Sequence, residues 1–288
     1  MQKRQLAIFI LFQFVAAVCL HAEKPAIQVQ LSALKSNGFL QLPQAQVLAL
    51  IGPHAPETDE ATIVFIEGDG RRWGGNGYFP PRDPTPLKSL SLELALFTSD
   101  VLQSPVIYIA RPCQFQHYTT SKGCSLADWS SQRYAQKHVD TMVTTIQTQL
   151  KTSLKKNNKI NATKLIIIGH SGGGVMAIRI AASMTRHGIE VQRIVTMAAP
   201  LEPQFWAAHM GLSPFELDNY QSDLSLVINS INGWYLWGSN DQVVPIGSVP
   251  KGLTLNSKKS TSQILSGIKH NEGWQIFWKS HMNNLMLR

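Results

Sequence analysis

A serine surrounded by glycines follows a run of aliphatic residues near the middle of this 288-residue chain. The run Lys164–Ile168 has the continuous apolar pattern of a strand buried on both faces, and Val175–Met184 has the alanine-rich pattern of a buried helix. The motif between them, Gly169-His170-Ser171-Gly172-Gly173, predicts a sharp strand-to-helix turn, because small flanking residues let the backbone turn tightly. Such a turn gives the serine a positive φ and exposes its hydroxyl at the sheet edge. A glycine-rich connection needed only for helix–strand packing is the alternative.

Strand and helix patterns alternate along most of the chain, which predicts an α/β fold with a mostly parallel central sheet and helices on both faces. The expected strands are Ala61–Ile66, Val106–Ala110, Lys164–Ile168, Ile194–Met197, Tyr235–Trp237 and Gln263–Ile268. The expected helices are Leu87–Phe97, Asp128–Lys151, Val175–Met184 and Trp274–Leu287. Two earlier segments, 27–34 and 47–51, are expected to be extended and to begin the sheet in antiparallel orientation. Residues 201–233, rich in aromatic residues and proline, predict a small cap or loop excursion over the site.

A serine hydroxyl needs a base, itself oriented by an acid, and in this kind of turn they follow the serine in the order acid, histidine. Asp241 lies in a loop just after the predicted strand Tyr235–Trp237, where parallel sheets place their functional residues. An aspartate that only closes a turn beside Asn240 is the alternative. Asp218 and Asp223 are weaker candidates for the acid, because they precede this strand.

His270 is the expected base, since it follows the predicted strand Gln263–Ile268 and precedes the terminal helix. A surface or helix-start histidine is the alternative. His281 lies inside the terminal helix, His138 lies inside another predicted helix, and the side chain of His170 is expected to point away from the nucleophile. The predicted catalytic set is Ser171, Asp241 and His270.

An oxyanion needs two backbone donors. The amide of Gly172, at the start of the helix after the serine, is expected to be the first. The loop Glu67-Gly68-Asp69-Gly70 follows the first predicted central strand, and the backbone N–H of Asp69 is expected to be the second. The alternative is that these acids and glycines only form a turn. Because an acid side chain aimed at the oxyanion would oppose it, Arg71 or Arg72 is expected to neutralise one carboxylate.

These residues resemble the α/β-hydrolase superfamily. The resemblance rests on Gly169-His170-Ser171-Gly172-Gly173, Gly238-Ser239-Asn240-Asp241-Gln242-Val243-Val244-Pro245 and Lys269-His270-Asn271, and it covers most of residues 45–288. It implies an esterase- or lipase-like serine hydrolase that forms an acyl-enzyme and uses neither a metal nor an organic cofactor. Many members carry His-Gly or His-Gly-Gly-Gly in the oxyanion loop, where this chain has Glu67-Gly68-Asp69-Gly70. That departure argues against the lipase–esterase branch with the triple glycine.

The first residues predict export from the cytoplasm. Lys3 and Arg4 precede an apolar run, Leu6–Leu20, and Ala22 offers a small residue for cleavage. We therefore expect a signal peptide at residues 1–22 and a single mature domain at 23–288, located in the periplasm or outside the cell. An uncleaved anchor is the alternative, although the run is short for a membrane span. No second long apolar run follows, so no stable membrane span is expected after cleavage.

Two cysteines remain in the mature chain, Cys113 and Cys124. In an oxidising compartment an even pair at this spacing predicts a disulfide bond across a short loop. A metal site is the weaker interpretation, because two cysteines this far apart supply too few ligands.

The net charge of +8 comes from scattered basic residues and not from a stripe with interleaved aromatics, so nucleic-acid binding is not expected. Three functions stay open. The first is cleavage of a small-molecule ester. The second is cleavage of an amide, as an amidase or small peptidase, with the same triad. The third is a non-catalytic envelope protein that keeps the fold as a binding module. The acyl group, the leaving group and the oligomeric state are not indicated by the sequence.

Overall fold

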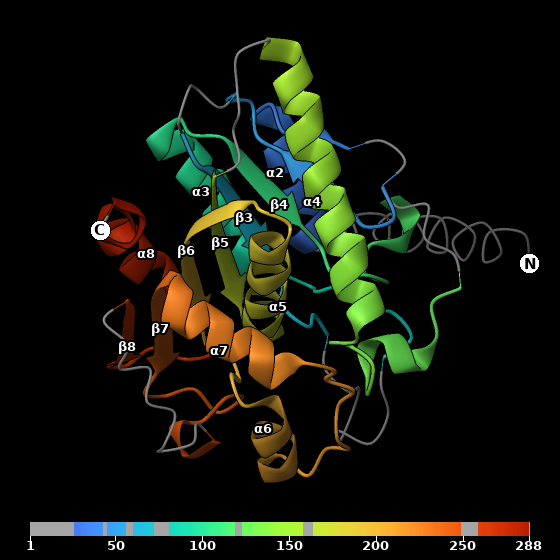
Figure 1. Ribbon diagram of the computed structural model, residues 1–288, viewed down its shortest axis with the longest axis vertical. Coiled ribbons are helices and arrows are strands. Elements are labelled where there is room, and N and C mark those ends of the chain that lie inside the picture. The colour runs from blue at the N-terminus through green and yellow to red at the C-terminus, as the bar shows by residue number, and fades with distance from the viewer. Residues whose placement is uncertain are drawn as a thin grey trace, which may run out of the picture.

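An eight-stranded sheet forms the centre of the protein in a computed structural model that describes residues 26–42, 45–55, 60–71, 81–118, 123–157, 164–248 and 259–287 (Figure 1). The strand order is β1-β2-β4-β3-β5-β6-β7-β8. The first two pairings, β1 with β2 and β2 with β4, are antiparallel, and all later pairings are parallel. The strands are β1 Leu40–Gln41, β2 Ala49–Ile51, β3 Thr62–Ile66, β4 Val106–Ile109, β5 Lys164–His170, β6 Glu190–Met197, β7 Asn232–Gly238 and β8 Ser260–Leu265.

Helices cover both faces of this sheet. One face packs against α4, α5 and α7, and the other packs against α2, α3 and α8. The central strands are buried on both sides: along β3, Val64 and Ile66 face the first layer, while Ile63 and Phe65 face the second. The helices are α2 Ala26–Ser36, α3 Leu90–Leu102, α4 Gln136–Asn157, α5 Gly172–Arg186, α6 Pro203–His209, α7 Tyr220–Ser230 and α8 Trp274–Leu287.

The mostly parallel α/β architecture predicted from the sequence is confirmed, but two segments differ from prediction. Residues 27–34 are part of helix α2 and not an extended strand. Ile27, Leu31 and Leu34 are buried on one side of that helix, so the apolar residues of this segment have helical and not extended spacing. The antiparallel start of the sheet is made instead by β1 and by β2, the latter within the predicted segment 47–51.

The second difference is the start of α4, which begins at Gln136 and not at Asp128. Asp128 lies in a separate 3₁₀ turn, Leu126–Trp129, and its carboxylate accepts hydrogen bonds from the backbone N–H and hydroxyl of Ser125 at 2.7 and 2.9 Å. Ser125 and Asp128 thus form a capping box at the start of this short turn. The residues between this turn and α4 are therefore not helical, and one of them, Arg133, lines the cavity described below.

The segment 201–233 divides into two parts with different positions. Helix α6 projects beyond the carboxyl ends of the strands, at the bottom of Figure 1, and Trp206 on this helix lines the main cavity. Helix α7 instead packs beside α5 and connects β6 to the parallel strand β7. The excursion over the site is thus limited to α6 and the loop after it.

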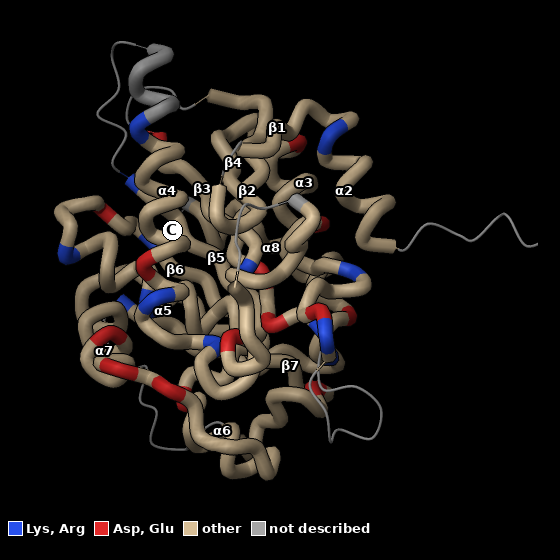
Figure 2. Tube along the Cα trace, turned by 90° about the vertical axis from the view of Figure 1, so that its right-hand side faces the viewer, with Lys and Arg blue, Asp and Glu red and all other residues tan. Residues whose placement is uncertain are grey.

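Charged residues of both signs are spread over the described part of the chain in Figure 2, with acidic residues along the segment that leads into α7. Among the described helices, none combines the length and the apolar character needed to cross a bilayer. The predicted signal peptide, residues 1–22, lies outside the described residues.

The predicted disulfide bond is present. Cys113 and Cys124 are bonded, with Cα atoms 5.8 Å apart. The bond closes the loop after β4, so that it constrains the polypeptide just beyond Arg111 and Pro112 at the carboxyl end of the sheet.

Reduction of this bond should destabilise the protein without abolishing the fold. A loop closed over a sequence separation of 11 residues contributes about 2–3 kcal/mol to the free energy of unfolding by loop-closure entropy. We expect dithiothreitol, or the double substitution Cys113→Ser with Cys124→Ser, to lower the melting temperature by several degrees. A reductant that lowers the melting temperature of the wild type and of the double variant equally would contradict this assignment.

Candidate active site

Ser171 lies on the turn between β5 and α5 and has φ 55° and ψ −130°, the positive φ expected from the motif. A non-glycine residue in this conformation costs about 1–3 kcal/mol, so neighbouring contacts must hold it. The N–H of Ser171 donates to the carbonyl of Met197 at 2.8 Å, which ties the turn to the end of β6.

Gly172 and Gly173 allow the loop after β3 to lie directly on the first turn of α5. A Cβ atom at Gly172 would lie 2.0 Å from Oδ1 of Asp69, and one at Gly173 would lie 2.5 Å from the carbonyl oxygen of Glu67. Both separations are impossible for real atoms, so only glycine fits at either position. The glycine-rich motif therefore serves both the turn itself and the close approach of the predicted oxyanion loop.

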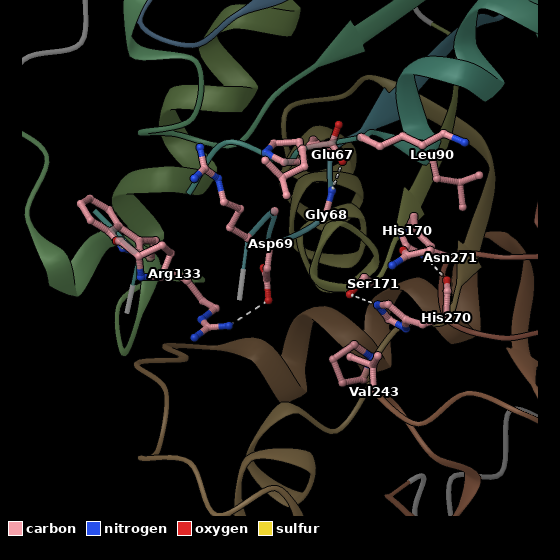
Figure 3. A pocket seen from close by; sticks show the side chains of 18 of the residues that line it. Glu67, Gly68, Asp69, Leu90, Arg133, His170, Ser171, Val243, His270 and Asn271 are labelled. Atoms are coloured by element: carbon pink, nitrogen blue, oxygen red, sulfur yellow. Dashed lines mark hydrogen bonds and ion pairs between the residues drawn. The ribbon is translucent and has the colours of Figure 1, made fainter. Parts of the chain in front are cut away.

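The structure brings the three predicted catalytic side chains together. Nε2 of His270 lies 3.0 Å from the hydroxyl oxygen of Ser171 (Figure 3). Nδ1 of His270 lies 2.8 Å from Oδ2 of Asp241. Each comes from the carboxyl end of a different strand: Ser171 follows β5, Asp241 follows β7 and His270 follows β8. Since these strands are parallel, the chain order alone places the residues at one edge of the sheet.

Asp241 is fixed by its own loop. Its Oδ1 accepts hydrogen bonds from the backbone N–H groups of Val243 and Val244 at 2.7 and 2.9 Å, which leaves Oδ2 for His270. Burial would raise the pKa of Asp241, but the hydrogen bond and charge of His270 and the two backbone hydrogen bonds hold that pKa below its usual value. The acid therefore stays ionised at neutral pH and can orient an imidazole.

The other candidates for acid and base lie elsewhere. Asp223 is paired with Arg179 and Arg186 between α5 and α7. His281 is exposed on α8, and His138 is buried beside Asp128. The carbonyl of Asp218 accepts a hydrogen bond from Arg179, away from Ser171.

The side chain of His170 contacts the loop that carries His270. Its Nε2 lies 2.8 Å from the backbone carbonyl of His270, and the two rings are 5.0 Å apart between centroids. The indole N–H of Trp274 donates to the same carbonyl at 3.0 Å. His170 thus contacts the main chain of His270, whose side chain in turn contacts Ser171. The pattern Gly-His-Ser alone does not reveal this contact, which depends on a loop 100 positions away.

The residues that carry the two predicted oxyanion donors, Gly172 and Asp69, lie close together, since a Cβ at Gly172 would be 2.0 Å from Oδ1 of Asp69. Among the described residues, the backbone N–H groups of Gly172 and Asp69 have no hydrogen-bond partner. The N–H of Gly68, by contrast, donates to Oε1 of Glu67 at 2.9 Å. Glu67 is buried, and its Oε2 accepts hydrogen bonds from Ser89 and from Tyr108. Burial raises the pKa of Glu67, and these hydrogen bonds oppose the shift.

Two other arginines neutralise Asp69, Arg111 at 2.8 Å and Arg133 at 3.0 Å. Arg71, one of the two arginines expected here, pairs with Asp83 at 3.3 Å, and the other, Arg72, lies outside the described residues. Neither Arg111 nor Arg133 has a predicted role at this loop: Arg111 directly follows the predicted strand Val106–Ala110, and Arg133 lies in the predicted helix Asp128–Lys151.

A cavity of about 590 Å³ opens over Ser171 and His270. One wall is apolar and comes from the turn after β6, from α6 and the loop after it, and from the loop of Asp241. It consists of Pro200, Trp206, Met210, Leu212 and Val243. The rest of the lining mixes charged and apolar residues. Asp69, Arg71, Lys88 and Arg133 line the cavity together with Pro81, Pro86, Leu87, Leu90 and Trp129. The cavity can therefore accept a molecule with an apolar part, with charged side chains within the same lining.

Comparison with known protein families gives a partial match. The family described as PGAP1-like alpha/beta domain matches residues 117–219, a segment that contains Ser171 but ends before Asp241 and His270. Among curated proteins, comparison of sequences finds no match.

Solved structures resemble the chain over most of its length. An esterase from Pyrococcus furiosus is 15% identical with a TM-score of 0.56, covering 87% of this chain and 91% of its own. Est1E from Butyrivibrio proteoclasticus, solved with ferulic acid bound, is 12% identical with a TM-score of 0.51, covering 86% and 100%. An alpha-beta serine hydrolase homologue from Coxiella burnetii is 13% identical with a TM-score of 0.50, covering 88% and 98%. With the strand order above, these likenesses show that the chain has the α/β-hydrolase fold.

Proposed function

We propose that this protein is an exported serine hydrolase that cleaves a small-molecule ester through an acyl-enzyme. The observation that carries the proposal is the chain of contacts from Ser171 through His270 to Asp241, at 3.0 and 2.8 Å. Serine, base and acid within hydrogen-bonding distance, on a strained turn at the edge of a parallel sheet, are the arrangement that activates a hydroxyl.

The reaction follows from this geometry. The hydroxyl oxygen of Ser171 attacks the ester carbonyl carbon while Nε2 of His270 takes the hydroxyl proton, and Asp241 stabilises the imidazolium through Nδ1. The carbonyl oxygen becomes an oxyanion that accepts hydrogen bonds from the amides of Gly172 and Asp69. Collapse of this intermediate breaks the bond to the leaving alcohol, which takes the proton from His270. Water then attacks the acyl-enzyme and gives a proton to His270. Collapse of this second intermediate releases the acid, while His270 returns the proton to the oxygen of Ser171.

The apolar wall of the cavity supports an ester of an apolar acid. Trp206, Met210 and Leu212 line the same cavity as Ser171, and burial of an acyl group against them is favourable by the hydrophobic effect. Of the structures that share the fold, the protein from Pyrococcus furiosus is named an esterase, and Est1E was solved with ferulic acid bound. Export is supported by the disulfide bond, because such bonds persist in oxidising compartments.

Labelling with a fluorophosphonate tests the nucleophile directly. We expect the wild type to be labelled on Ser171 and to hydrolyse activated esters, and we expect Ser171→Ala and His270→Ala to lower kcat at least 10³-fold, the order of effect seen when a triad member is removed. His281→Ala is the matched control, since this exposed histidine lies outside the site. A folded wild type that is not labelled would refute the proposal.

A panel of substrates with one acyl group separates the open alternatives. We expect hydrolysis of esters to exceed that of the corresponding amides, and we expect kcat/KM to rise with the apolar area of the acyl group. Replacement of Trp206 by Ala should reduce this dependence on acyl size, because it removes the one aromatic side chain among the residues of the apolar wall. Faster cleavage of amides would favour the amidase reading, and binding without turnover would favour the non-catalytic one.

The buried side chain of His170 should make the stability of the protein depend on pH. Burial, with a smaller contribution from the charge of His270, lowers the pKa of His170 to about 3. The unfolded chain takes up this proton near its ordinary pKa of about 6.5, so the contribution of His170 to stability falls as the pH drops from about 6.5 towards about 3. As the pH falls over that range, we expect the unfolding free energy of the wild type to decrease relative to that of His170→Gln, by up to roughly 1.4 kcal/mol per pH unit. Denaturant melts at several pH values measure it, and a difference independent of pH would contradict the assignment.

A further inference from the structure

The carboxylate of Asp69 is held by three donors from two other parts of the chain. Arg111 Nη1 donates to Oδ1 at 2.8 Å, and Arg133 Nη1 and the hydroxyl of Tyr134 donate to Oδ2 at 3.0 and 2.9 Å. Arg111 follows β4, whereas Arg133 and Tyr134 precede α4. The contacts therefore tie the loop after β3 to two neighbouring loops, as Figure 3 shows for the pair of Asp69 and Arg133.

The two guanidinium groups are themselves fixed. Arg111 Nη2 donates to the carbonyl of Arg133, and Arg133 Nε donates to the carbonyl of Ser130 at 2.9 Å. The side chains of Arg111 and Arg133 are only 6% and 9% exposed. Their planes lie over aromatic rings, Arg111 at 5.2 Å from the centroid of Tyr134 and Arg133 at 4.9 Å from that of Phe215. Asp69 is thus held by a rigid frame and not by mobile surface cations.

This frame changes the sign of the local charge. Burial would raise the pKa of Asp69, but the charges of Arg133 and Arg111 and the hydrogen bond from Tyr134 outweigh burial and lower that pKa, so the carboxylate is ionised. A lone carboxylate here would repel an oxyanion formed at Ser171. With two guanidinium groups on it, the group of Asp69, Arg111 and Arg133 carries a net positive charge.

The carboxylate also lies against the turn that carries the nucleophile. A Cβ atom added at Gly172 would lie 2.0 Å from Oδ1 of Asp69. A Cβ atom added at Gly68 would lie 3.5 Å from Cβ of Ser171. The main chain at 68–69 is therefore fixed at both ends, by the carboxyl of Glu67 on the N–H of Gly68 and by the frame on the side chain of Asp69. What stays unpaired between them, among the described residues, is the N–H of Asp69.

We propose that the side chain of Asp69, clamped by Arg111, Arg133 and Tyr134, is a positioning group that aims its own backbone N–H at the oxyanion formed on Ser171. The inference rests on the proposed function, because it assigns parts to the oxyanion site of that reaction. Arg111 and Arg133 also supply the excess positive charge that favours the oxyanion. A carboxylate clamp in this loop replaces the glycine-rich sequence that many members of the superfamily carry there.

The chain offers a matched control for a purely structural role of the clamp. Asp223 is likewise a buried carboxylate held by two arginines, Arg179 and Arg186, but it joins α5 to α7. Arg179 also donates to the backbone carbonyl of Tyr134, and this contact does not involve the Tyr134 hydroxyl that donates to Asp69. Loss of either clamp leaves buried arginine without its partner and destabilises the fold. Only the clamp at Asp69 should affect stabilisation of the oxyanion.

The experiment compares Asp69→Asn, Arg133→Gln and Tyr134→Phe with Asp223→Asn in the full-length chain. For each protein we would measure the melting temperature, kcat and KM for an activated ester, and inhibition by a trifluoromethyl ketone and by the matching alcohol. The ketone adds Ser171 to form a tetrahedral oxyanion, whereas the alcohol cannot. Tyr134→Phe removes one hydrogen bond and keeps the ring against Phe215, so it should fold even if the charge variants do not.

We expect Asp69→Asn and Arg133→Gln to lower kcat about 10²-fold, with KM changed less than about twofold, because the contact exists only in the transition state. Affinity for the ketone should fall in proportion to kcat, and affinity for the alcohol should not change. Tyr134→Phe should give a change of a few-fold in the same direction, and Asp223→Asn should lower the melting temperature alone.

The inference is overturned if the Asp69 clamp variants keep the ketone affinity of the wild type, or if Asp223→Asn weakens ketone binding to the same extent. A wild type that is labelled on Ser171 while its clamp variants are unaffected would refute the clamp and leave the hydrolase proposal standing. A wild type that is neither labelled nor active would refute both.

Discussion

The contact between the loop after β3 and the first turn of α5 is the constraint on which the rest of the site depends. The absence of side chains at Gly172 and Gly173 lets Glu67 and Asp69 approach the turn to distances that any Cβ would forbid. That approach limits where the two proposed oxyanion donors can lie, because the amide of Asp69 belongs to the loop and the amide of Gly172 belongs to α5. Even a single methyl group at Gly172 would separate the two halves of the site before any catalytic side chain was touched.

The base is held by the same turn from its other side. His170 precedes the nucleophile and hydrogen-bonds the carbonyl of His270, and Trp274 supports that carbonyl from the start of α8. The turn thus has a loop anchored on each flank, one with the oxyanion donor and one with the imidazole. This arrangement makes the relative position of nucleophile, base and donor a property of one short segment, with Asp241 as an external support for the imidazole.

The sequence predicted the sheet, the order of the central elements and the three side chains that meet at its edge, because each depends on local periodicity or on chain order. It misplaced the first helix, since Ile27, Leu31 and Leu34 are too few to separate helical from extended spacing without a view of what they pack against. It also missed Arg133, whose position depends on α4 beginning at Gln136 and not at Asp128. Contacts such as His170 with the His270 carbonyl join distant segments and leave no local pattern.

The backbone angles of Ser171 have a consequence for the stability of this chain. With φ 55° and ψ −130°, the residue occupies a region that suits glycine better than any residue with a side chain. Replacement of the serine by glycine would therefore relieve backbone strain, and the proposed nucleophile carries a conformational cost that the rest of the fold offsets. The deep burial of α5 and the strands around it supplies the reserve of stability from which that cost is met.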